Sequence, residues 1–153
     1  MRLEEVLNNK ELKTIEPSKE SAELKFKRGL KKFKFAQNNL TPPGFEEEVY
    51  SAAYDAVRIV CEAFLLLKGY KARSGDGYHW RVIEAVKCLL KNDIKEEIYF
   101  RISRMRNKRH GVEYDTTIIS DTEMRQAIKD TVALISVVGK KIKGNTDELF
   151  NNL

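Results

Sequence analysis

The chain has 153 residues, of which 42% are hydrophobic and 33% charged, so it can bury one proper core and is too short for two comfortable domains. Its formal net charge of +5 permits a nucleic-acid partner without requiring one. No stretch approaches the roughly 18 consecutive apolar residues of a membrane span, and the acidic N-terminal segment does not resemble a signal peptide. We therefore expect a cytoplasmic protein with no membrane partner.

The two cysteines give no sign of a metal site. Cys61 and Cys88 lie far apart, match no metal-ligand spacing and sit inside apolar periodic segments, so we expect buried reduced thiols in a reducing compartment. The sequence shows no cluster of Asp, Glu, His and Cys that could hold a catalytic cation, so neither a metal nor another cofactor is expected.

The N-terminal part predicts an arm followed by a first long helix. Residues 1–16 are interpreted as a loosely attached arm, because Asn8 and Asn9 interrupt a short apolar pattern. The helix is expected to open at Pro17. Its inward positions step by four, four and three residues: Ala22, Phe26, Leu30 and Phe33. Lysines and an arginine on the opposite face are either a solvated surface or a second basic surface.

The middle of the chain predicts two more helices. Pro42 and Pro43 force a loop, and the most apolar segment, 45–68, then reads as a central helix covered on two sides. The glycine-rich stretch 69–77 is interpreted as a plain connection, because no strand precedes it as in a phosphate-binding loop. A third helix follows from His79, which we interpret as a capping or packing residue rather than a catalyst.

The last third predicts a basic helix and a final amphipathic one. Asp93 is a plausible N-cap for the basic helix, which is expected to break at Gly111. Residues 116–119 suit a brief extended segment, and Ser120 with Glu123 has the form of a capping box at the start of the last helix.

These segments predict an all-α fold, an up-and-down antiparallel bundle of four to five helices with no sheet. The predicted single domain spans 17–144, because Gly144 is expected to end the last helix. A flexible tail is expected over 145–153.

The basic stretch at 101–110 is the densest concentration of charge in the chain. Ile94, Ile98, Ile102 and Met105 recur at the spacing of one apolar helical face. At about 100° per residue, Tyr99, Arg106 and His110 fall on one shoulder of that face, whereas Arg101, Arg104 and Lys108 fall on the other. Such charge either binds an anionic partner or merely complements the carbonyl end of the helix.

Over residues 45–143 the chain resembles the HEPN domains (higher eukaryote and prokaryote nucleotide-binding domains) of bacteria and archaea. The resemblance rests on an Ala-rich second helix that ends in Leu65-Leu66-Leu67-Lys68-Gly69-Tyr70, and on the later helix that His79 opens. Its most specific part is Arg106-Asn107-Lys108-Arg109-His110-Gly111, followed by Tyr114.

The resemblance implies a metal-independent endoribonuclease whose site forms across a homodimer, and one role it suggests is the toxin half of a toxin–antitoxin or defence system. His110 would exchange protons with the ribose 2′-oxygen or the leaving 5′-oxygen, and a nearby arginine would stabilise charge on the phosphate. Its RNA contacts would come from the rest of the basic stretch: Arg101, Asn107, Lys108, Arg109 and Tyr114.

Two arginines compete for the place beside His110. RNA-cutting members carry an arginine, four to six residues and then a histidine, so the family spacing favours Arg104, with five residues between. Helical geometry favours Arg106, one turn or about 6 Å from His110 along the axis. In toxin members a tyrosine lies two residues beyond the histidine, whereas Tyr114 lies four beyond.

Two other classes of function stay open. Some relatives of the resembled family are non-catalytic binding modules that partner a minimal nucleotidyltransferase antitoxin or a nucleic acid. The chain could also be a structural protein that dimerises through its helices. If Arg104, Arg106 and His110 all faced solvent on a monomer, catalysis would lose most of its support.

Overall fold

The computed structural model describes residues 3–41 and 43–143. The elements, in chain order, are α1 (Leu3–Asn8), β1 (Leu12–Thr14), α2 (Lys19–Asn38), α3 (Glu46–Lys68), β2 (Tyr70–Ala72), α4 (Tyr78–Leu90), the 3-10 turn η1 (Lys91–Asp93), α5 (Glu96–Tyr114) and α6 (Asp121–Lys143). The predicted helical fold class is confirmed over these residues. No helix among them is long and apolar enough to cross a membrane.

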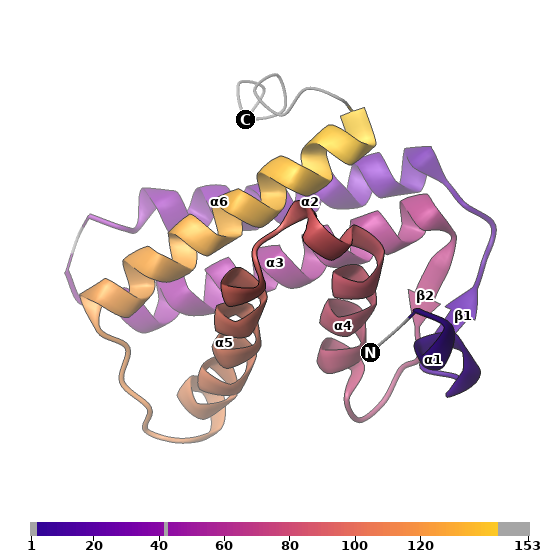
Figure 1. The fold of residues 1–153 in the computed structure, drawn as a ribbon. Coiled ribbons are helices and arrows are strands. Elements are labelled where there is room, and N and C mark those ends of the chain that lie inside the picture. Colours follow the sequence, from indigo (N-terminus) through magenta and orange to yellow (C-terminus); the bar gives the residue numbers. More distant parts are fainter. Residues whose placement is uncertain (1–2, 42, 144–153) are drawn as a thin grey trace.

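Helix α3 is the centre of the molecule, with α2 and α6 packed along it (Figure 1). Helices α2 and α3 approach closely at Gly29, where an added Cβ would stand 2.7 Å from a methyl group of Val60. Small residues on α3, such as Ala53 and Ala56, are fully buried. The alanine-rich start of α3 therefore lets its neighbours approach closely, as small residues do at tight helix contacts.

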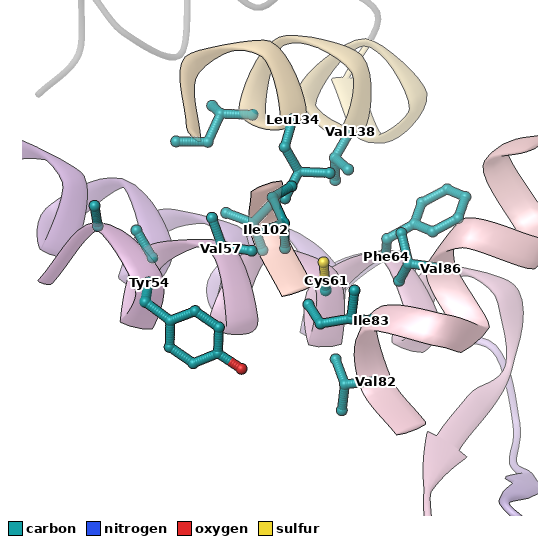
Figure 2. Close-up of a cluster of buried hydrophobic side chains, with 14 of the residues drawn as sticks. Tyr54, Val57, Cys61, Phe64, Val82, Ile83, Val86, Ile102, Leu134 and Val138 are labelled. Carbon is teal, nitrogen blue, oxygen red and sulfur yellow. The ribbon is translucent and has the colours of Figure 1, made fainter. Parts of the chain in front are cut away.

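Helices α4 and α5 lie on the side of α3 opposite α2. They run side by side across the direction of α3 (Figure 1). The ends of α4 and α5 that lie nearest α3 and α6, here called the inner ends, contribute side chains to the core between the long helices. Figure 2 shows Val82, Ile83 and Val86 of α4 beside Cys61 of α3, with Ile102 of α5 below α6. All of these side chains are buried. The core thus holds the inner ends of α4 and α5, and their outer ends project beyond it.

The N-terminal arm is packed, contrary to the expectation of a loose attachment. Strand β1 pairs with β2 in an antiparallel two-stranded sheet, with Leu12 opposite Ala72, and Val6 of α1 is buried. The Glu11 carboxylate also pairs with the buried guanidinium of Arg81 on α4. The prediction of no sheet was therefore wrong, and Leu12 of the arm is buried where β1 pairs with β2.

Gly111 does not break the basic helix, which continues to Tyr114. A Cβ at Gly111 would lie 3.1 Å from the Cβ of Thr117 and closer still to its hydroxyl oxygen. The glycine is therefore explained by close approach of the returning chain rather than by a left-handed turn. Asp93 is not the N-cap of α5 either; it belongs to η1, and the cap position is Lys95 without a side-chain hydrogen bond.

The capping box at the start of α6 is confirmed. The Glu123 backbone N–H donates to the Ser120 hydroxyl at 3.1 Å, and the Ser120 N–H donates to the Glu123 carboxylate at 3.1 Å. The expected helix end at Gly144 and the tail 145–153 lie outside the described residues. Of the two free thiols, Cys61 is buried as predicted, whereas Cys88 is only half-buried.

Candidate nucleic-acid interface

Helix α5 presents its basic residues to two separate hollows, one on the Arg104 side of the helix and one on the Arg106 side. The first, the α5–α6 pocket, has a volume of about 250 Å³ and is lined by Tyr50, Arg101, Arg104, Met105, Lys108, Thr122, Glu123, Gln126, Ala127 and Asp130. The second, the α4–α5 cleft, has a volume of about 600 Å³ and is lined by Gly75, Gly77, Tyr78, His79, Trp80, Arg106, Asn107, Arg109, His110 and Tyr114.

The charges of the α5–α6 pocket are largely paired within the chain. Arg101 donates two hydrogen bonds, of 2.8 and 2.9 Å, to the buried carboxylate of Asp130. Lys108 pairs with Glu123, and this contact is the main cause that holds the pKa of the Glu123 carboxyl below its usual range. Only Arg104, which is exposed, lacks a carboxylate within salt-bridge distance among the described residues. The ion pairs in this pocket mainly hold α5 against α6.

The α4–α5 cleft differs because no Asp or Glu is among its lining residues. Arg106 is half-buried and pairs with no carboxylate of the described chain; its side chain donates to the Asn107 amide oxygen at 3.3 Å. His110 is exposed, and its ring centroid lies 4.8 Å from that of Tyr114. The cleft therefore carries cationic and aromatic groups that a ligand anion could reach.

Arg109 forms part of the cleft wall, and carboxylates that are not part of the cleft lining hold its guanidinium in place. Its guanidinium lies 3.1 Å from an Asp55 carboxylate oxygen and 3.4 Å from one of Glu113, and it stands 5.9 Å from the ring centroid of Tyr54. The buried Tyr54 hydroxyl has no hydrogen-bond partner in the described chain, and burial is the main reason that its pKa is raised. Arg109 is thus partly neutralised, which leaves Arg106 as the more available cation.

The α4 side of the cleft is fixed to α3 through one buried carboxylate. Glu62 accepts a hydrogen bond of 2.5 Å from the Tyr78 hydroxyl and one of 2.7 Å from Arg58. Because Tyr78 is the first residue of α4, this bond attaches the start of the helix to α3. The same anchor places the next two residues, His79 and Trp80, on the cleft wall.

His79 and Trp80 are site residues that the sequence analysis missed. The sequence predicts a packing or capping role for His79, and its half-buried ring does lie 5.6 Å from that of Tyr54. It nevertheless lines the cleft together with His110. No spacing in the sequence could have joined them, because they come from different helices. The available signal was the clustering of Tyr78, His79 and Trp80 directly after a glycine-rich loop.

The three residues predicted to be catalytic do not share one hollow. Arg106 and His110 line the α4–α5 cleft, as do Asn107, Arg109 and Tyr114, whereas Arg104 lines the α5–α6 pocket with Arg101 and Lys108. The helix remains regular from Arg104 through His110, so these two side chains stay on different faces. Over the described ranges, no three His, Cys, Asp or Glu side chains are grouped so that they could hold a metal ion.

Comparison with known proteins adds no assignment of class or identity. No family model matches the chain, no curated protein matches it, and no solved structure matches it. The function therefore has to be argued from the cleft itself.

Proposed function

We propose that this protein is a metal-independent endoribonuclease of HEPN-like type, acting at the α4–α5 cleft. The proposal includes the finer architecture that the resemblance implies, an up-and-down HEPN-like bundle of four to five helices. The observation that carries it is the placement of Arg106 and His110 together in a cleft whose lining has no carboxylate. A phosphate diester would meet cations and an imidazole there, and the nearest carboxylates given for the wall, those of Asp55 and Glu113, are paired with Arg109.

The proposed reaction is a transesterification of the RNA backbone. The ribose 2′-oxygen loses its proton to a base and attacks the adjacent phosphorus, while the bond to the 5′-oxygen breaks and that oxygen takes a proton from an acid. His110 performs one of the two transfers, because imidazole can accept or donate a proton near neutral pH. Arg106 stabilises the charge on the phosphorane.

The second proton-transfer group has two candidate sources. One is His110 of a partner copy, in the homodimer that the family resemblance implies; the exposure of His110 supports this, since a second copy would shield it from water. The other is His79, which lines the same cleft in the same protomer. Sedimentation at micromolar concentration is expected to show a dimer, and a monomer that still cuts RNA would favour His79.

Purified protein incubated with single-stranded RNA in excess chelator tests the proposal. We expect the wild type to cut, His110→Ala to lose about 100-fold or more of the rate, and His79→Gln to report whether the second group is local. Cleavage that persists in His110→Ala, or that stops for the wild type on chelation, would contradict the mechanism.

The alternative is a non-catalytic module that binds nucleic acid or a minimal nucleotidyltransferase. It becomes the better explanation if neither wild type nor variants cut RNA, but the wild type binds RNA or that partner with salt-sensitive affinity. The toxin role in a toxin–antitoxin or defence system would then need a different activity.

A further inference from the structure

The α4–α5 cleft combines aromatic surface with positive charge. Tyr78, Trp80 and Tyr114 line it in addition to the two imidazoles. Tyr114 is 75% exposed, and Trp80 is only half-buried. Large rings left in contact with water are typical of binding surfaces, because covering them gains free energy.

Aromatic surface and positive charge together limit the chemical classes of ligand that the cleft can bind. Positive charge alone would suit any phosphate or acidic peptide, and aromatic surface alone would suit an apolar ring. Nucleotides carry both a phosphate and a flat base, and bases stack on aromatic side chains while arginine contacts the backbone. A volume of about 600 Å³ also lies in the range of sites that enclose small ligands.

We infer that the cleft binds single-stranded nucleic acid, with one base stacked on Trp80 from the α4 wall, a neighbouring base on Tyr114 from the α5 wall, and the phosphate between them on Arg106. A duplex is excluded from this mode, because its bases are already stacked on each other and present only their edges. The inference rests on the proposed function in that it names the substrate of the same cleft. It requires no catalysis.

Trp80 is the only tryptophan in the chain, so its fluorescence reports on the cleft directly. The 153-residue protein would be titrated with a single-stranded DNA oligonucleotide of about eight nucleotides, which lacks the 2′-hydroxyl and cannot be cut by the proposed reaction. We expect saturable quenching, at least about tenfold weaker binding of the corresponding duplex, and a loss of about tenfold in affinity for Tyr114→Ala.

A matched control is Leu24→Ala, since Leu24 is an exposed apolar residue on α2, away from the cleft; its affinity should equal that of the wild type. Arg106→Ala should weaken binding and lower its salt dependence. The inference is overturned if the duplex binds as tightly as the single strand, if Tyr114→Ala has no effect, or if a poly-glutamate peptide quenches Trp80 equally well.

The two proposals can fail separately. Quenching by the oligonucleotide without any cleavage of RNA would sustain the binding site and remove the ribonuclease. Cleavage of RNA by a protein whose Trp80 does not respond, and whose Tyr114→Ala variant cuts at the wild-type rate, would do the reverse.

Discussion

His79 lies in surroundings that favour its neutral form. Burial lowers the pKa of its imidazole below the usual value of about 6.5. The cations Arg58 and Arg109 lower that pKa further, and the carboxylates Glu62 and Asp55 oppose them with smaller effects. The ring centroids of Tyr54 and Tyr78 lie 5.6 and 6.1 Å from that of His79. A neutral imidazole in the cleft can accept a proton.

This environment predicts a pH dependence of stability. The unfolded chain binds a proton at His79 near pH 6.5, whereas the folded chain binds it only at lower pH, so the unfolded state is favoured as the pH falls through about 6.5. We expect the free energy of unfolding to fall less steeply in His79→Gln than in the wild type between about pH 7.5 and 5.5, by at most about 1.4 kcal/mol per pH unit. Urea denaturation at several pH values measures both slopes. Equal slopes would show that His79 is not held neutral.

Helix α5 shows how a glycine can mislead an interpretation of helix ends. Glycine favours helix termini, so the sequence predicts a break at Gly111, but this residue lies inside the last turns of α5. The contact that requires it comes from Thr117, on the segment that returns toward α6. That contact is invisible in helical periodicity, since it depends on where the chain goes after the helix.

Gly111→Ala separates these two explanations. Helix propensity alone predicts a gain of about 1 kcal/mol in the free energy of unfolding. The clash with Thr117 predicts instead a loss of about 1–3 kcal/mol. We expect the loss in a urea titration, and we expect Thr117→Gly in the same chain to restore part of it. A stabilised single variant would refute the close approach.

The long helices were predictable because their apolar positions repeat at helical spacing. The buried side chains of α2, α3 and α6 follow that pattern, and the capping box marks the start of α6. The sheet was not predictable in the same way. Strand β1 has only three residues, and Leu12 finds its partner Ala72 far along the sequence. Pairing at that distance leaves no local periodicity.

When the whole molecule is considered, the sequence predicted only the residues that α5 contributes to the candidate site. The spacing on α5 separated the Arg106 side of the helix from the Arg104 side, but it could not show what faced each side. Three structural facts supply that: α6 brings Asp130 and Glu123 to one side, α4 brings His79 and Trp80 to the other, and Glu62 anchors the start of α4.

The central claim is that RNA is cut in the α4–α5 cleft rather than in the α5–α6 pocket. The most direct test compares single-turnover cleavage rates of Arg106→Ala and Arg104→Ala, two identical substitutions on α5 that lie two residues apart and face different hollows. Removal of a group that stabilises the transition state typically costs about 100- to 1000-fold in rate, so we expect a loss of that size for Arg106→Ala. For Arg104→Ala we expect a rate within about fivefold of the wild type, because an exposed charge outside the cleft contributes little. A large loss in Arg104→Ala with a near-normal rate in Arg106→Ala would contradict the account and place the reaction at the other pocket.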